Sequence, residues 1–184
     1  NVYNVAVGYN SGTAVTTGTA NTFIGGRAGD ATTTGSTNVA VGTDALGSNT
    51  TASNNVAIGY DCLVANTTGA TNTALGTSSL ATNTTASNNT AVGHGALTAN
   101  TTGTRNNALG NLSLVANTTG DNNVALGSQT LQANTTADDN TAVGYAALNV
   151  NTTGANNTAV GKFAGLAVTT GGYNTLVGSL AGDS

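Results

Sequence analysis

Residues 89–105 read N-T-A-V-G-H-G-A-L-T-A-N-T-T-G-T-R, and this stretch recurs with small changes along the whole chain. The glycine that closes its first five residues lies 17 residues from the equivalent glycine of the next copy, in eleven copies without insertion or deletion. The T-T pair recurs in all ten copies that are long enough to contain it. A fixed internal period of this length indicates a repeat architecture, in which each copy forms one unit that stacks on the next.

The asparagine and the glycine of the first five residues do not vary between copies. We number the positions of each copy 1 to 17 from the asparagine, so that Asn89 is position 1 and Gly93 is position 5. If equivalent residues stack, the asparagines form a ladder of side-chain amides, and the glycine column indicates a positive φ or a close backbone approach. The predicted structural ladder comprises Asn4, Asn21, Asn38, Asn55, Asn72, Asn89, Asn106, Asn123, Asn140, Asn157 and Asn174, with the glycine column represented by Gly8, Gly59, Gly110 and Gly161.

The composition argues against a thick globular core. The 184 residues include no Pro, Met or Trp, and only 4% are aromatic and 5% charged. Such a chain can fill a thin core with ranks of Ala, Val, Ile, Leu and Thr, and the regular placement of these residues argues against a disordered tract. The net charge of −4 and the lack of basic clusters argue against nucleic-acid binding. No apolar run is long enough to predict membrane insertion, and no motif predicts a cofactor.

Each copy begins with a short strand-like run such as residues 55–59, whose side chains alternate between two faces. A second short segment, such as residues 96–99, is predicted as a further strand, and a polar corner such as residues 100–103 leads into the next copy. The sequence therefore predicts an all-β fold, a parallel β-solenoid or β-roll of eleven 17-residue coils. These coils form one repeat domain over residues 1–184, with no cap at either end and more chain expected beyond both.

Self-association is predicted because eleven stacked coils would expose a continuous hydrophobic wall, which monomers rarely tolerate. We expect a homotrimer, intertwined or side by side, with the alanines of position 3 at its seam because small side chains suit a crowded contact. A single-chain solenoid polymerised end to end is the alternative, since uncapped ends expose strand edges. The predicted seam comprises Ala40, Ala57, Ala74, Ala91, Ala108, Ala125, Ala142 and Ala159.

The outer copies differ from the middle ones at position 9. The middle seven copies have Leu there, and the outer four have Gly. We expect large side chains at other positions to replace the missing leucine in the outer copies, so that the total volume of core side chains is conserved. The bulk that reappears in the outer copies comprises Phe23, Phe163, Leu166, Leu176 and Leu180.

The N-V-A-I-G block at residues 55–59, with its ten relatives, resembles the head repeat of YadA-type trimeric autotransporter adhesins. The longer form with N-T-T-G, and the variant N-T-F-I-G-x-x-A-G at residues 21–29, is similar to repeats of bacteriophage tail-fibre proteins. This resemblance covers essentially the whole chain. It implies a left-handed parallel β-roll that trimerises and lies outside the cell, on a bacterial surface or in a virion tail fibre.

The polar residues with reactive side chains do not predict an enzyme. His94 is the only histidine, and no acidic residue occupies a matching column in its own or adjacent copies. Arg27, Asp44 and Asp61 share position 7 in successive copies, which predicts a surface charge ladder or, as the alternative, a cation held between the two carboxylates. A second acidic cluster, expected to be solvated rather than to bind metal, comprises Asp121, Asp138 and Asp139, near Arg105.

A cysteine and a set of asparagines are candidates for redox chemistry and for modification. The lone Cys62 occupies a column of Ala and Ser and is predicted to be a small buried hydrophobe. The N-T-T triplets match the pattern for N-glycosylation, but a structural Asn/Thr ladder at a corner is the preferred interpretation. Their asparagines are Asn49, Asn66, Asn83, Asn100, Asn117, Asn134 and Asn151.

The leading functional hypothesis is a structural fibre shaft, in a phage tail fibre or a bacterial surface appendage, that holds a binding tip at a distance. The first alternative is an adhesin that binds a host-surface receptor along its side, and the second is a filament polymerised end to end. The third is an ice-binding solenoid, which the sequence disfavours because adjacent threonines on a strand face opposite ways and bulky asparagines flank them. The expected adhesin contacts are Tyr9, Tyr60, His94, Tyr145 and Tyr173.

Overall fold

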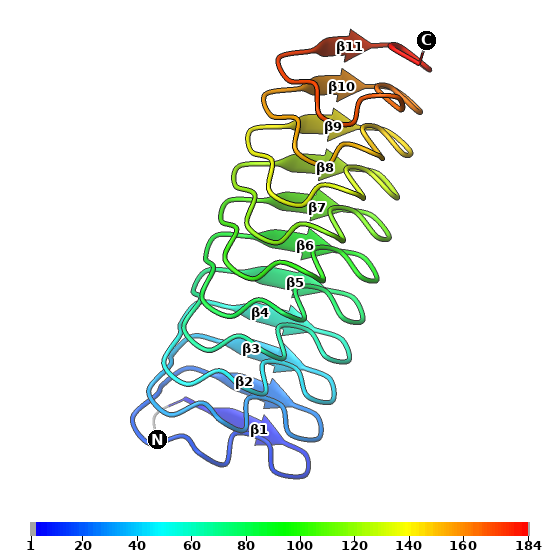
Figure 1. The fold of residues 1–184 in the computed structure, drawn as a ribbon. Coiled ribbons are helices and arrows are strands. Elements are labelled where there is room, and N and C mark those ends of the chain that lie inside the picture. Colours follow the sequence, from blue (N-terminus) through cyan, green and yellow to red (C-terminus); the bar gives the residue numbers. More distant parts are fainter. Residues whose placement is uncertain (1–2, 184) are drawn as a thin grey trace.

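The computed structural model describes residues 3–183 and confirms a parallel β-solenoid (Figure 1). One three-residue strand from each coil contributes to a single parallel sheet, in which the strands lie in chain order. The pairing register is 17 residues throughout, so that Thr90 lies between Thr73 and Asn107. The strands are β1 (Val5–Val7), β2 (Thr22–Ile24), β3 (Val39–Val41), β4 (Val56–Ile58), β5 (Thr73–Leu75), β6 (Thr90–Val92), β7 (Asn107–Leu109), β8 (Val124–Leu126), β9 (Thr141–Val143), β10 (Thr158–Val160) and β11 (Thr175–Val177).

The prediction of a second strand in each coil is wrong. Residues 94–99 form a turn, and Leu97 within it has a φ of 52°. Positive φ recurs at positions 5, 7, 9 and 17 of the coils, which breaks the extended geometry that a strand requires. These turns still stack, because the N–H of Leu97 donates to the carbonyl of Ser113 in the next coil at 3.1 Å. Hydrogen bonds between coils therefore extend well beyond the sheet.

The glycine of position 5 behaves as predicted, with φ between 126° and 143° in every coil. A Cβ on Gly93 would lie 2.6 Å from the carbonyl oxygen of Gly110, so the column needs glycine for both conformation and space. By contrast, Gly103 at position 15 does not have positive φ, and Ala52 occupies the same position three coils earlier. The two glycine columns are thus used for different reasons.

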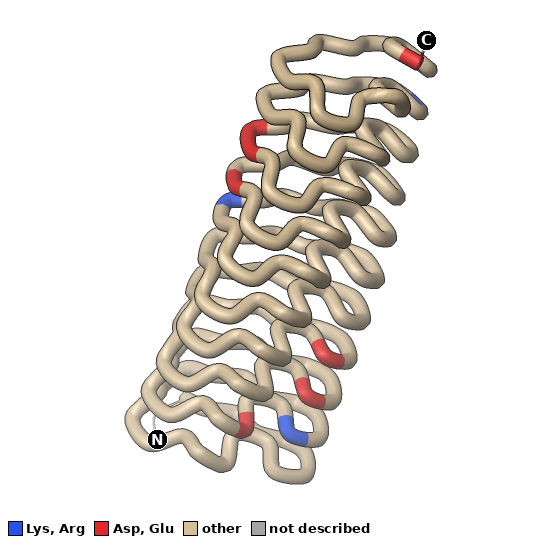
Figure 2. Tube along the Cα trace, viewed as in Figure 1, with Lys and Arg blue, Asp and Glu red and all other residues tan. Residues whose placement is uncertain are grey.

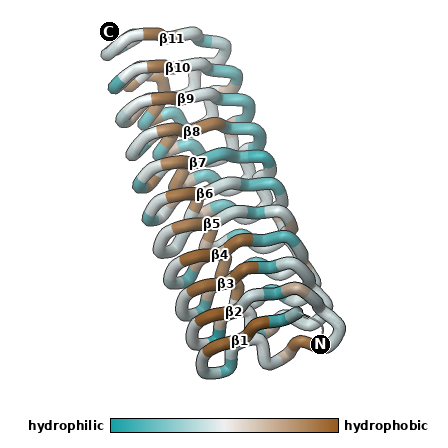
Figure 3. Tube along the Cα trace, turned by 180° about the vertical axis from the view of Figure 1, so that it is seen from behind, coloured by the Kyte–Doolittle hydropathy of each residue, from teal (hydrophilic) through white to brown (hydrophobic). Residues whose placement is uncertain are grey.

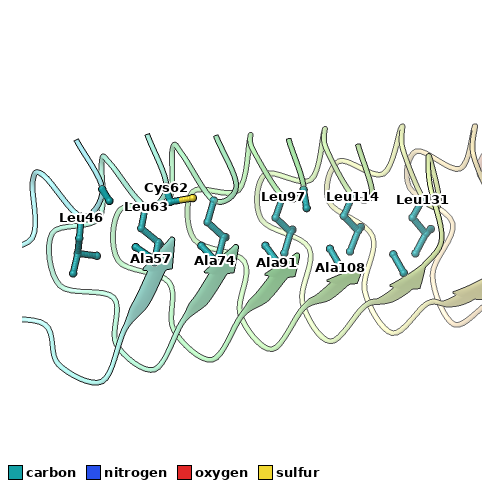
Figure 4. Close-up of a cluster of buried hydrophobic side chains, with 14 of the residues drawn as sticks. Leu46, Ala57, Cys62, Leu63, Ala74, Ala91, Leu97, Ala108, Leu114 and Leu131 are labelled. Atoms are coloured by element: carbon teal, nitrogen blue, oxygen red, sulfur yellow. The ribbon is translucent and has the colours of Figure 1, made fainter. Parts of the chain in front are cut away.

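The core is a narrow layer of packed side chains inside each coil, between the strand and the turn (Figure 4). Leu97 from the turn and Ala91 from β6 both have 0% exposure and lie on facing sides of this layer. The eight alanines of position 3 from Ala40 to Ala159 are 0–1% exposed within one chain, whereas Ala6 in the first coil is exposed. The predicted seam is therefore wrong, because Ala40, Ala57, Ala74, Ala91, Ala108, Ala125, Ala142 and Ala159 already pack inside their own coil.

Core volume moves between columns at the two ends, as predicted for two of the large residues. Phe23 is 1% exposed, and a Cβ at Gly12 or Gly29 would lie only 2.8 or 2.6 Å from its ring. At the other end, a Cβ at Gly182 would lie 2.9 Å from Leu176. The prediction does not hold for Leu180, which is half exposed on the surface, nor for Phe163, whose ring contacts Tyr145 on the outside of the coil at a centroid distance of 5.3 Å.

Candidate functional site

The asparagine ladder of position 1 is confirmed in all ten neighbouring pairs of coils. In each pair the side-chain Oδ1 accepts the backbone N–H of the next asparagine, at 2.8–3.0 Å. The Nδ2 of Asn89 also donates to the carbonyl of Gly103, which ties the start of the coil to its end. These side chains satisfy the backbone N–H of the residue just before each strand, so the column is required by the fold.

A second asparagine ladder occupies position 12, where the sequence predicted a corner ladder. The Nδ2 of Asn100 donates to Oδ1 of Asn83 at 3.0 Å and to the carbonyl of Gly103 at 2.9 Å. The ladder stops where position 12 becomes Val168, and Oδ1 of Asn151 is left without a hydrogen-bond partner. Asparagines at 0% exposure cannot accept a glycan while the coil is folded, so the glycosylation alternative is excluded for Asn49, Asn66, Asn83, Asn100, Asn117, Asn134 and Asn151.

The carboxylates of the second acidic cluster, Asp121, Asp138 and Asp139, accept hydrogen bonds from the preceding coil. Oδ1 of Asp138 accepts the N–H of Asp121 at 2.7 Å, and Oδ1 of Asp139 accepts Nδ2 of Asn122 at 3.1 Å. Serines do the same at this position in other coils, for example Ser87, whose Oγ accepts the N–H of Ala70 at 3.0 Å. Sequence reasoning missed this role, although the Ser, Thr and Asp residues that share position 16 were a usable signal. Each carboxylate therefore caps a backbone or amide donor of the preceding coil.

The charge ladder of position 7 forms as predicted. Nη2 of Arg27 lies 2.6 Å from Oδ2 of Asp44, and this hydrogen bond is the main reason why the pKa of Arg27 is raised. Asp61 raises the pKa of the neighbouring Tyr60 through its negative charge and a hydrogen bond. Figure 2 shows the charged residues of this ladder on the edge of the rod opposite the second acidic cluster. Within residues 3–183, no three His, Cys, Asp or Glu side chains lie close enough together to hold a metal ion.

Cys62 is buried, as predicted. Its Sγ lies 2.6 Å from the carbonyl oxygen of Gly76 and 3.2 Å from Oγ of Ser79. Burial raises the pKa of the Cys62 thiol, so the group is a weak nucleophile in the folded chain. His94 is exposed, and its ring is near the side-chain amide of Asn111 in the next coil. No nucleophile or carboxylate accompanies it there among the hydrogen bonds of the described chain.

The outer face of the sheet carries an apolar stripe along the whole rod. Position 4 is Val, Ile or Leu in all eleven coils, and its side chains point away from the core, next to those of position 2. Figure 3 shows this stripe from behind as hydrophobic residues that recur on every strand. Leu109 is 50% exposed and Val7 is 58% exposed. This is the apolar wall that the sequence predicted, but it is built from position 4 and not from the alanines, and the neighbouring position 2 is Thr in six coils, Val in four and Asn in one.

The tyrosines proposed as adhesin contacts divide between two edges. Tyr9, Tyr60, His94 and Tyr145 share position 6 and are all exposed, whereas Tyr173 lies at position 17 on another corner. The surface of residues 3–183 contains no pocket, and no helix in this part of the chain is long and apolar enough to cross a membrane. The chain matches no family model, no curated protein and no solved structure.

Proposed function

We propose that this chain is a rigid shaft segment of an extracellular fibre, in a phage tail fibre or a bacterial surface appendage, that sets the distance to a binding tip. The observation that carries the proposal is the uninterrupted register of eleven coils, each tied to the next by the same backbone and asparagine bonds. At about 4.8 Å per coil the stack is roughly 50 Å long. Its length is therefore fixed by the number of repeats and by nothing else.

The partner of this shaft is a further copy of the chain, packed against the outer sheet face. The exposed aliphatic side chains of position 4, such as Leu75, Leu109 and Val160, form a stripe that no segment of residues 3–183 covers. No charged residue occupies position 2 or 4 in any coil. A second copy offers the same stripe at the same spacing, so packing of two or three chains removes apolar area from water at about 25 cal/mol per Å². A homotrimer remains the preferred assembly.

Deletion of residues 89–122, which make up two coils, tests the shaft directly. Because the ladders rejoin in register across the cut, we expect a folded rod that is shorter by roughly 10 Å with an unchanged cross-section. Small-angle X-ray scattering of the full chain and of the deletion variant gives both quantities. A deletion variant that unfolds, or one that keeps the original length, would contradict the proposal.

Leu109→Asp tests the partner face. The side chain points outward, so the variant should fold like the parent, but a carboxylate in the apolar contact should weaken self-association at least tenfold. Light scattering over a concentration series measures this effect, with circular dichroism to confirm folding. The matched control is Asn88→Asp, an exposed residue at position 17 on another corner, which should associate like the parent. A parent that stays monomeric at every concentration would rule out the proposed contact.

Adhesion along the side is a second candidate, favoured by the exposed aromatic residues of position 6. Tyr9 and Tyr60 are 77% and 53% exposed on one edge, three coils apart. Repeated weak contacts along such an edge add up through avidity. Binding of the isolated chain to cells, with a Tyr60→Ser variant for comparison, separates adhesin from passive shaft. A passive shaft gives no binding in either case.

A further inference from the structure

One exposed column of the rod does not vary, and the fold does not explain why. Position 14 is threonine in all ten complete coils, and every one of these residues is exposed. Other exposed columns vary freely, as position 6 does with Tyr9, Thr43 and His94. The exposed threonines are Thr17, Thr34, Thr51, Thr68, Thr85, Thr102, Thr119, Thr136, Thr153 and Thr170.

The side chains of these threonines make no hydrogen bond within residues 3–183, in contrast to their neighbours at position 13. The Oγ1 of Thr101 donates to the carbonyl of Thr118 in the next coil at 3.0 Å, and equivalent bonds recur along the rod. Position 13 therefore has a structural reason to be threonine. For Thr102 no intramolecular contact supplies one, and its hydroxyl is free to bind something outside the chain.

The two threonine columns together form a regular surface. Equivalent residues of parallel in-register strands repeat at about 4.8 Å, and both columns follow that register. The axial hydrogen bond of position 13 fixes the hydroxyl of Thr101, and hence the direction of its methyl group. The surface therefore presents hydroxyl and methyl groups at one spacing over ten coils.

The structure removes both sequence-based objections to an ice-binding face. The threonine segment is not a strand, and both Thr101 and Thr102 reach the surface, one half-buried and one exposed. The flanking Asn100 is 0% exposed and does not interrupt the face. Positions 11 to 15 contain no charged or aromatic residue in any coil, and position 11 is mostly alanine. The face therefore consists of small, uncharged side chains that recur in every coil.

We propose that this surface, defined by positions 13 and 14, binds crystalline ice through ordered water. A partner that meets all ten contacts at once repeats with a similar translation, and the coil period of about 4.8 Å is close to the oxygen repeat of ice along its a axis. In this proposal the threonine hydroxyls bind ordered water, and the methyl groups lie between the bound waters. In Figure 1 the segments that carry these residues pass in front of the strands, so this face and the apolar sheet face lie on different sides of the rod. The inference is thus independent of the shaft contact.

The test is incorporation of the labelled full chain into slowly growing ice, together with thermal hysteresis. The parent is expected to concentrate in the ice and to depress the freezing point below the melting point. Thr102→Lys places a long charged side chain in the middle of the surface and should reduce both readouts severalfold. Asn88→Lys adds the same group on another corner and should match the parent.

Three outcomes overturn the proposal. These are exclusion of the parent from ice with no hysteresis, equal behaviour of Thr102→Lys and Asn88→Lys, and a threonine face that is a contact between copies. The last outcome would appear as a loss of self-association in Thr102→Lys by light scattering. Circular dichroism confirms that both variants are folded, and because the shaft test measures length and mass, its failure is distinguishable from failure here.

Discussion

Gly93→Ala is expected to destabilise the solenoid by more than about 4 kcal/mol, the range in which single substitutions are exceptional. Gly93 has a φ of 131°, which residues other than glycine rarely adopt. Its added Cβ would also lie 2.6 Å from the carbonyl oxygen and 2.7 Å from the carbonyl carbon of Gly110. These are backbone atoms of the next coil, so the clash adds to the strain of the positive φ. Urea denaturation followed by circular dichroism measures the loss.

Gly103→Ala is the matched control for this substitution. A Cβ there would also crowd the carbonyl oxygen of Gly120, but Ala52, Ala86 and Ala137 already occupy the same column in other coils. The backbone at this position does not need positive φ, so small shifts of the neighbouring coil suffice. We expect a cost of about 1 kcal/mol or less. Equal costs for the two substitutions would show that spacing, and not φ, makes position 5 glycine.

Asn100→Asp is expected to make the stability of the rod strongly dependent on pH. Asn100 is fully buried and donates through Nδ2 to Oδ1 of Asn83. A carboxylate cannot donate this bond and would be an uncompensated buried charge, which costs roughly 3–5 kcal/mol. Burial raises the pKa of such a carboxyl above its unfolded value near 3.9. The variant should therefore be most stable below that pH and should lose stability as the pH rises through the higher pKa of the folded state.

Urea denaturation of the Asn100→Asp variant at several pH values, beside Asn88→Asp, tests this expectation. The exposed control residue has no buried amide to replace and should follow the parent at every pH. A variant as stable as the parent at pH 7 would mean that the ladder of position 12 tolerates a break. Val168 and Thr32 already terminate that ladder near the two ends of the rod, but neither of them carries a charge.

The repeat length and the invariant residues were enough to predict the solenoid, the sheet register and the asparagine ladder of position 1. The sequence could not show which face of the strand lies inside, because Val56 and Ala57 are both apolar. The sequence therefore predicts the alanines at a contact between chains. In the structure they face the leucines inside the coil, where the space opposite Leu63 admits only a small side chain. Phe23 in the alanine column, beside glycines at position 9, was the usable signal that the two columns share one core.

The turn was missed for a different physical reason. Leu97 and its six equivalents adopt positive φ at 48–56°, which leucine rarely does and which propensity alone would not predict. The glycines at the same position in the outer coils, such as Gly12 and Gly165, were the clue that the column is left-handed throughout. Burial of the leucine side chains in the core layer offsets this backbone cost. The acidic residues could not be interpreted without the hydrogen bonds of position 16, since a carboxylate cap and a solvated carboxylate look alike in sequence.

The hydrogen bonds between coils run along the rod, and this has a mechanical consequence. Most of the backbone bonds outside the turns, and one bond of every asparagine ladder rung, join one coil to the next. Tension applied at the two ends therefore loads these interfaces in series, so that the weakest coil peels away before the others feel a larger force. Parallel bundling of chains would place several such interfaces side by side, so that each one carries only part of the load.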